Sequence, residues 1–318
     1  MTPSVPGSWP DLPFEKWRDT AATLQLWTQI VGKIRLAKSP WLNHSWHVAL
    51  YVTSRGLTTS PIPYDDGRSF ELHFDFIEHA LHIDVSDGGQ RKIALEPRTV
   101  ADFYSALMQA MRELEIPVAI KEKPCEIAGA ISFSTDTQHA SYDAEYAQRF
   151  WRALVQIDRV FKQFRTAFLG KCSPVHFFWG SFDLAVTRFS GPRAPLFEGK
   201  PPGVAVEVMR EAYSHEVSSA GFWPGGNGID FPAFYSYAYA TPASFKSQPV
   251  KPAAACFSEQ LGEFLLPYDA VRTAADPDAA LMEFLQSTYE AAANTAKWDR
   301  AALECSVGLP GVPRGVQS

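Results

Sequence analysis

The chain has 318 residues, of which 46% are hydrophobic and 20% are charged. These values are typical of a globular protein that buries a substantial core in one large domain or two smaller ones. The net charge of -6 argues against nucleic-acid binding, which requires a clustered basic surface. No stretch approaches the roughly 18 uncharged apolar residues of a membrane-spanning helix, so we expect no membrane association.

The cysteines and the N-terminal segment indicate the compartment in which the protein works. The four cysteines are far apart and include no C-x-x-C pair, which indicates neither a zinc site nor a disulfide framework. The N-terminal segment has no basic region followed by an apolar run, so no signal peptide is predicted. We therefore expect a soluble cytoplasmic protein with reduced thiols at Cys125, Cys172, Cys256 and Cys305.

The first half of the chain predicts a helix, paired strands and a second helix. Apolar residues at three- and four-residue spacing predict a helix over residues 19–37, which Pro40 ends. Two hairpins follow, and the second turns at Asp87-Gly88-Gly89. A closing helix is expected over residues 100–114, with Thr99 in position to cap it.

The second half repeats this order of elements. A helix is expected over residues 144–169, several strands follow, and a closing helix starts at Asp276. Each half therefore reads as helix, about four strands, helix. The sequence predicts an internally duplicated α+β fold with antiparallel sheets covered by helices. Residues 1–116 are the first repeat, 117–143 a linker and 144–318 the second repeat, packed together as one compact unit.

An aromatic run with embedded polar residues, Ser173–Gly191, contains the first candidate site. His176 is a candidate acid or base because an ordinary imidazole titrates near neutral pH. Asp183 is a candidate for orienting a histidine, and Arg188 for holding an anionic group of a ligand. Structural roles are the alternatives. Asp183 falls in the expected hairpin turn, where an aspartate commonly bonds its own backbone, and His47 stands at the equivalent point to His176 in the first half.

The segment AYSHEVSSAGFWPGG supplies the second candidate histidine. On an extended strand, Tyr213 and His215 share one face and Glu216 lies on the other. His215 is a candidate acid or base, and the other two are candidate ligand contacts. The alternative is an edge strand whose polar side chains are solvated.

Aromatic side chains near these strands predict a pocket wall. Tyr237 belongs to FYSYAYA, where tyrosines follow one face; this pattern indicates either a core under helices or a wall that presents hydroxyl groups. Trp223 stands beside a glycine-rich turn that would serve as a lid, and Trp179 ends the aromatic run. Arg193 is a second candidate for holding an anionic group. These residues predict a ligand pocket in the C-terminal half.

Metal and cofactor sites have little support in the sequence. The alternating face formed by Glu71, His73 and Asp75 has the residue types of a metal site. The same alternation is typical of a half-solvated sheet, and we expect no metal. The sequence lacks the signatures of zinc proteases, α/β-hydrolases, dinucleotide-binding proteins and EF-hands. It therefore leaves the cofactor unknown and the oligomeric state open.

Four segments of the second half have a distinctive sequence: SPVHFFWGSFDLAVTRFSG, EAYSHEVSSAGFWPG, FYSYAYATP and EFLLPYDAVR. With them the chain resembles a bacterial family catalogued only as a domain of unknown function. The resemblance covers nearly the whole chain and implies a single-unit protein without implying an activity. In one departure, Pro192 stands before Arg193 where the family pattern has Gly-Arg. Because these segments lie in the second half of the chain, the resemblance implies that a functional site would lie there.

Together these observations predict a protein that handles a small molecule in an aromatic-lined polar pocket. The interpretation leans towards an enzyme in which His176 and His215 carry acid–base chemistry with the help of Asp183. The alternative is a non-catalytic protein that binds or senses a small ligand in the same pocket. A small-molecule ligand is the expected partner, with no nucleic acid and no membrane.

Overall fold

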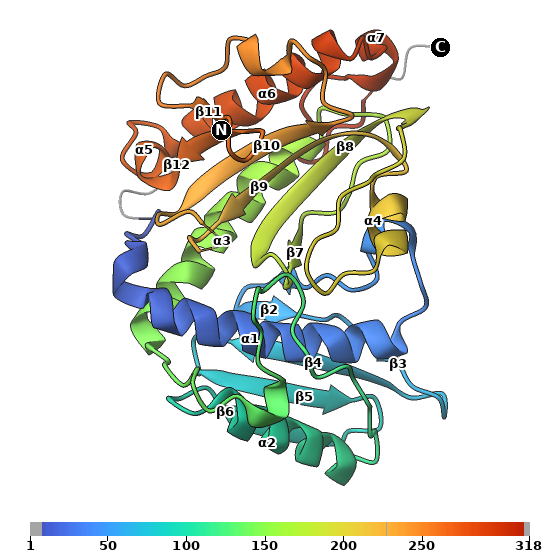
Figure 1. Ribbon diagram of the computed structural model, residues 1–318, viewed down its shortest axis with the longest axis vertical. Helices are drawn as coiled ribbons and strands as arrows, with labels where there is room; N and C mark the ends of the chain where they lie inside the picture. The colour runs from blue at the N-terminus through green and yellow to red at the C-terminus, as the bar shows by residue number, and fades with distance from the viewer. Residues whose placement is uncertain (1–7, 227, 315–318) are drawn as a thin grey trace.

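The computed structural model describes residues 8–226 and 228–314. The N-terminal half places short strands between two helices (Figure 1). In chain order, its elements are α1 (Phe14–Lys38), the 3-10 turn η1 (Asn43–Ser45), β1 (Tyr51–Val52), β2 (Gly56–Thr58), β3 (Ile62–Pro63), β4 (Ser69–Asp75), β5 (Ala80–Val85), β6 (Gln90–Ala94) and α2 (Val100–Glu113).

A linker with the 3-10 turn η2 (Phe133–Thr135) leads into the C-terminal half. This half opens on a long helix and closes on three helices, with a longer set of strands between them (Figure 1). Its elements are α3 (Ala144–Arg165), β7 (His176–Phe178), β8 (Asp183–Arg193), α4 (Val206–Ala212), β9 (His215–Trp223), β10 (Ala233–Tyr239), the 3-10 turn η3 (Phe245–Ser247), β11 (Cys256–Ser258), β12 (Glu263–Pro267), α5 (Tyr268–Arg272), α6 (Pro277–Thr295) and α7 (Arg300–Leu303).

The strands form two antiparallel six-stranded sheets, which confirms the expected α+β class. The N-terminal sheet has the order β1-β2-β4-β5-β6 with β3 on β4, and the C-terminal sheet has the order β11-β12-β10-β9-β8-β7. Six strands per half replace the expected four, in part because β3 and β11 span only two or three residues, too few for an alternating pattern. The strand orders of the two sheets differ, and the internal duplication stays a prediction.

Local sequence signals produce the elements that they indicated. The Thr99 hydroxyl accepts a hydrogen bond of 3.0 Å from the amide of Asp102 and so caps α2. Asp276 caps α6 in the same way, through an amide 3.0 Å away. The turn between β5 and β6 places Gly88 at φ 95°, a conformation that favours glycine.

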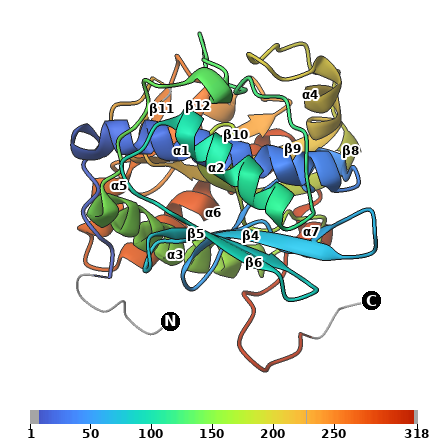
Figure 2. The same cartoon turned by 90° about the horizontal axis from the view of Figure 1, so that it is seen from below.

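Helix α1 crosses the molecule between the two sheets (Figures 1 and 2). On one side, the Trp27 ring stacks on Phe103 of α2 at a centroid distance of 4.6 Å. On another, the Trp17 ring lies 5.2 Å from Phe150 of α3. Protein surrounds most of this helix, so its buried positions extend around nearly all of its faces. They include polar residues such as Gln29.

The two halves are joined by hydrogen bonds as well as by apolar packing. Backbone groups of Leu50 and Phe177 exchange hydrogen bonds of 2.8 and 2.7 Å. The Gln29 side chain exchanges hydrogen bonds of 2.9 and 3.0 Å with the backbone of Cys125 in the linker. One cluster of buried apolar side chains includes residues of both halves and of the linker. The domain boundaries expected after residues 116 and 143 stay predictions.

The C-terminal sheet has two faces of different character. Helices α3 and α6 cover one face, where Leu184, Phe222 and Phe234 are fully buried. Side chains alternate along each strand, so the neighbouring residues point to the opposite face. That opposite face carries more polar side chains and forms the base of the candidate site.

Candidate functional site

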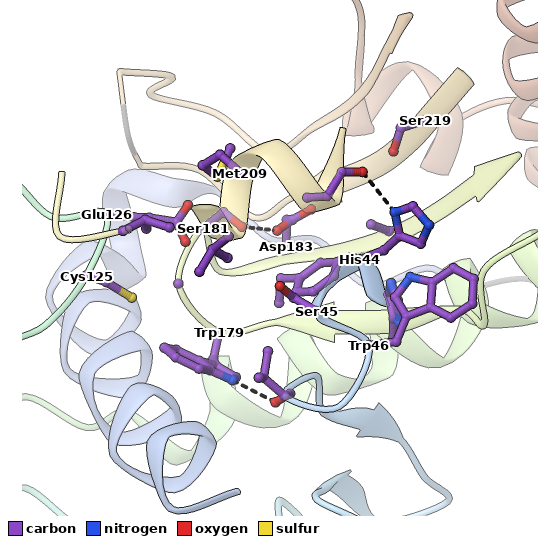
Figure 3. A pocket seen from close by; sticks show the side chains of 18 of the residues that line it. His44, Ser45, Trp46, Cys125, Glu126, Trp179, Ser181, Asp183, Met209 and Ser219 are labelled. Atoms are coloured by element: carbon purple, nitrogen blue, oxygen red, sulfur yellow. Dashed lines mark hydrogen bonds between the residues drawn. The ribbon is translucent and has the colours of Figure 1, made fainter. Parts of the chain in front are cut away.

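A cavity of about 580 Å³ lies on the face of the C-terminal sheet opposite α3 and α6 (Figure 3). Strands β7, β8, β9, β10 and β12 contribute its base. The other walls come from the end of α1, segment 41–48, linker segment 121–126 and segment 203–213, which includes α4. Both halves and the linker therefore build the cavity, whereas the sequence indicated the C-terminal half alone.

The strand register explains why this face leaves space. His176, Ala185, Gly221 and Tyr235 lie side by side across β7, β8, β9 and β10. The two central residues, Ala185 and Gly221, are small, so they leave space above the sheet between the imidazole of His176 and the phenol of Tyr235. A Cβ atom on Gly221 would lie 2.3 Å from the Tyr235 ring, so only glycine permits this ring to lie across β9.

Asp183 is a buried acid of the cavity wall. It is the first residue of β8 and is 3% exposed, so its interpretation as the polar tip of a hairpin is wrong. Its carboxylate accepts hydrogen bonds from the hydroxyl groups of Ser181 and Tyr235. Burial raises the pKa of Asp183 to about 6, because the low-dielectric interior disfavours the charged form and the two hydrogen bonds offset only part of that effect.

Two further acids, Glu126 and Glu263, line the same cavity. Burial raises the pKa of Glu126 to about 7 and that of Glu263 to about 8, and the negative charge of Asp183 adds to both shifts. In the described part of the chain, neither carboxyl group forms an ion pair. Sequence reasoning missed both residues, since one lies in the irregular linker and the other opens an apolar strand.

His176 faces the cavity but differs from the expected neutral-pH acid or base. Its side chain is 1% exposed, and burial, helped by the charges of Arg165 and Arg35, lowers its pKa to about 3. The imidazole is therefore neutral at physiological pH. Its Nδ1 atom has no hydrogen-bond partner among the described residues.

His215 lies on the same side of the sheet, outside the cavity wall. Its Nδ1 atom is 3.0 Å from the hydroxyl of Ser214. Sequence reasoning missed a second histidine of the cavity wall, His44, whose ring centroid is 6.2 Å from that of His215. His44 lies 2.9 Å from the carbonyl of Ala212 and 2.6 Å from the Lys171 ammonium, and it thereby ties segment 41–48 to the end of α4.

The predicted aromatic residues all lie in the cavity wall: Trp179, Tyr213, Trp223 and Tyr237. The Trp179 indole donates a hydrogen bond of 2.8 Å to the carbonyl of Val48. The hydroxyl groups of Tyr213 and Tyr237 are 3.0 Å apart, and burial raises the pKa of Tyr213 to about 12. The Trp223 ring stacks on the Tyr235 ring at 4.3 Å. Of the two alternatives for the tyrosine face, the structure therefore shows the pocket wall.

Arg188 lies on the opposite face of β8 and contributes nothing to the cavity wall, which corrects the expectation that it faces a ligand there. Its side chain is 1% exposed and donates a hydrogen bond of 2.5 Å to the carbonyl of Phe164. The guanidinium lies over the rings of Phe164 and Tyr289, 3.4 and 4.4 Å from their centroids. Burial lowers the pKa of Arg188 to about 10, so it remains charged and stabilises the α3 side of the sheet.

Arg193 and Glu216 also lie outside the cavity wall. Arg193 is exposed at the end of β8, where a register irregularity follows Phe189. The Glu216 carboxylate accepts hydrogen bonds of 2.9 Å from Ser190 and 3.0 Å from the Trp298 indole. It points away from the face that carries the cavity, as the strand alternation predicted.

The polar face of the N-terminal sheet brings Asp75, Glu78 and His82 together, with candidate ligand atoms within 4.8 Å of one another. Their charges already have partners in the chain. Asp75 accepts hydrogen bonds from Arg55 and two backbone amides, and Glu78 pairs with Lys92. This cluster is therefore an ion-pair network in which the buried Asp75 and the exposed Glu78 already have cationic partners.

The fold and the cavity define an α+β protein in which aromatic side chains and buried carboxyl groups surround a small internal space. Across the described ranges, the helices are all too short or too polar to cross a membrane. A family model matches residues 9–305, and the chain belongs to that family of unknown function (DUF5996). Searches of curated proteins and of solved structures found no match. The expected membership of a family without an assigned activity is confirmed.

Proposed function

We propose that this protein binds a small molecule in the cavity and acts on it as an acid–base enzyme. The observation that carries the proposal is the convergence of Asp183, Glu126 and Glu263 on one aromatic-lined space of about 580 Å³. This volume is in the range of ordinary small-molecule sites, which are largely apolar with a few convergent polar groups.

The carboxyl groups are better matched to proton transfer than the histidines. At pH 7 Asp183 is mostly ionised and Glu263 is mostly protonated, since their pKa values are about 6 and about 8. One group then accepts a proton from the bound molecule and the other donates one, the usual assignment for acids whose environments separate their pKa values. His176 is neutral and is proposed to orient the ligand by hydrogen bonding rather than to exchange protons.

A non-catalytic binding or sensing role is the second candidate. Both Asp183 oxygens accept side-chain hydrogen bonds, from Ser181 and Tyr235, and these hold the carboxylate in one orientation. Such a fixed carboxylate suits ligand recognition without turnover. We further propose a cytoplasmic location, because the four free cysteines suit a reducing compartment. We propose no nucleic-acid partner, because the net charge is -6.

The test is a ligand screen with a variant that closes the cavity. Val208 lines the cavity from α4, a helix on which no residue is fully buried, so Val208→Trp is expected to fold. A panel of neutral, cationic and anionic fragments is screened by thermal shift and calorimetry. We expect hits that bind the native protein and Arg210→Trp, the exposed control on the same helix, and fail to bind Val208→Trp. A screen without Val208-sensitive hits would overturn the proposal.

Catalysis is separated from binding in a second step. Each hit is incubated with the protein, and products are sought by mass spectrometry. The enzyme candidate predicts that Asp183→Asn abolishes turnover while binding persists. If the native protein binds hits and converts none, the binding or sensing role replaces the enzyme.

A further inference from the structure

We propose that the cavity selects an organic cation, a small molecule with a protonated amine on an apolar or aromatic body. This inference rests on the proposed small-molecule function and specifies the class of ligand. It follows from the charges of the wall, from two polar atoms without partners and from the aromatic rings beside them.

Within the described ranges, the acids of the wall have no positive partner. Among the described residues, Asp183, Glu126 and Glu263 form no ion pair with a lysine, arginine or histidine. Two lysines, Lys33 and Lys121, also line the cavity, and within the described residues neither forms an ion pair with these acids. Lys33 donates a hydrogen bond of 3.0 Å to the carbonyl of Lys123 instead. A buried carboxylate without a partner is costly, so an occupant that brings positive charge is stabilised beside the ionised Asp183 where a neutral or anionic one is not. The same positive charge favours the ionised form of Glu263, which is mostly protonated at pH 7 without it.

Two polar atoms in the wall also have open hydrogen-bonding positions. His176 is 1% exposed, and its Nδ1 atom has no partner within residues 8–226 and 228–314. The Oε2 atom of Glu263 is likewise buried and without a partner there. Buried polar groups in folded proteins are nearly always paired, so these two atoms point to groups that a ligand supplies. An ammonium N–H would donate to Glu263, and a second polar group of the ligand would pair with His176.

Aromatic rings beside the acids suit the same ligand. Trp223 stacks on Tyr235, and Tyr235 lies parallel to Tyr237 with centroids 6.2 Å apart. Ring faces attract cations and also accept a flat apolar body. Carboxylates and ring faces together therefore favour an amine over an alcohol or an acid of the same shape.

Three probes that share an indole ring test the charge preference: tryptamine, indole-3-ethanol and indole-3-acetate. Their dissociation constants are measured by calorimetry with the full chain at pH 7.5. We expect tryptamine to bind at least tenfold more tightly than indole-3-ethanol, and indole-3-acetate to bind more weakly than either. Equal binding of the amine and the alcohol, or tightest binding of the acid, would overturn the assignment.

Variants connect the preference to the wall. Glu263→Gln, which keeps the shape of the side chain, is expected to reduce the advantage of tryptamine to threefold or less and to leave indole-3-ethanol unaffected. Glu259→Gln is the control, because Glu259 is exposed and pairs with Lys246. If Glu263→Gln preserves the tenfold advantage, the acids of the cavity do not cause it and the assignment fails.

Failure of the cation assignment is distinguishable from failure of the proposed function. If neutral or anionic members of the wider panel bind and Val208→Trp blocks them, the cavity still handles small molecules and only the assignment of the cation is wrong. If no member of the panel or of the indole series binds in a Val208-dependent way, both proposals fail.

Discussion

The phenol of Tyr235 on β10 donates a hydrogen bond to the buried carboxylate of Asp183 on β8. Strand β9 lies between these two strands, so the side chain of Tyr235 reaches across a whole strand. Gly221 makes this possible, since its missing Cβ leaves the place that the phenol ring occupies. The three residues form a connection that orients an acid in the cavity wall.

Tyr235→Phe is expected to raise the pKa of Asp183 above about 6, because the lost hydrogen bond stabilises the ionised form. It should also destabilise the fold by about 2 kcal/mol, as removal of a hydrogen bond to a charged group does. Carboxyl NMR titration and urea unfolding measure the two effects. Tyr239→Phe is the control, since its hydroxyl bonds the carbonyl of Pro195 at the exposed edge. An unchanged Asp183 pKa would contradict the role of Tyr235.

Gly221→Ala is expected to destabilise the protein by about 1–3 kcal/mol, the usual cost of overpacking a well-packed site. The added methyl group would lie 2.3 Å from the Tyr235 ring and must displace it. In the double variant Gly221→Ala/Tyr235→Leu the methyl group has room, so the two losses should be less than additive. A thermodynamic cycle from urea unfolding measures this coupling. Strict additivity would show that the ring does not depend on Gly221.

Stability should fall as the pH rises from 6.5 to 9, and Glu263 should cause much of the fall. Its native pKa of about 8 exceeds its ordinary value of 4.5, so the folded protein holds this proton more tightly than the unfolded chain. The stabilisation is complete below about pH 4.5 and is lost as the pH rises through 8. Asp183 and Tyr237 face the same carboxyl group, and Asp183 is already mostly ionised in this range.

Urea unfolding of Glu263→Gln across this range tests the expectation. The variant should show a fall in the free energy of unfolding that is smaller by about 1–2 kcal/mol, given about 1.4 kcal/mol per pKa unit and partial exposure. His176 acts in the opposite direction, because its pKa is lowered from 6.5 to about 3, but its contribution changes only below pH 6.5. Parallel curves for the native protein and the variant would contradict a raised pKa at Glu263.

Arg188→Ala is expected to destabilise the fold by about 3 kcal/mol while ligand binding in the cavity persists. The change leaves a void under the sheet and removes the hydrogen bond to the carbonyl of Phe164. Arg193→Ala, at an exposed position, should change the free energy of unfolding by no more than about 0.5 kcal/mol. Thermal unfolding and calorimetry with a hit from the ligand screen measure the two properties. Loss of ligand binding in a variant of unchanged stability would show that Arg188 contacts the ligand.

Much of the local structure could be predicted from the sequence. Periodicity identified the long helices, and capping residues such as Thr99 and Asp276 identified their starts. Alternation along β9 correctly separated Glu216 from the face that carries Val217 and Ser219. These signals were readable because each depends on contacts within a few residues. The three-residue strand β11 was missed because it contains too few residues to show a clear alternation.

The candidate site could be predicted only in part. Trp179, Asp183 and Tyr237 were found because two strands, and the turn after β7, carry unusual aromatic and polar content. Glu126 and Glu263 had no such signal, and Arg188 was misplaced because the sequence does not say which face of β8 helices α3 and α6 cover.

The sequence by itself determined the long helices α1, α2, α3 and α6, the hairpins, the α+β class and the family to which the chain belongs. Only the tertiary structure decided that a linker acid, a strand acid and Asp183 meet on one cavity, and that burial moves their pKa values towards neutrality. The physical reason is the distance along the chain over which each kind of interaction acts. Backbone hydrogen bonding and side-chain periodicity are set by neighbours in the chain, whereas the loss of solvent around a charge depends on every element that closes over it.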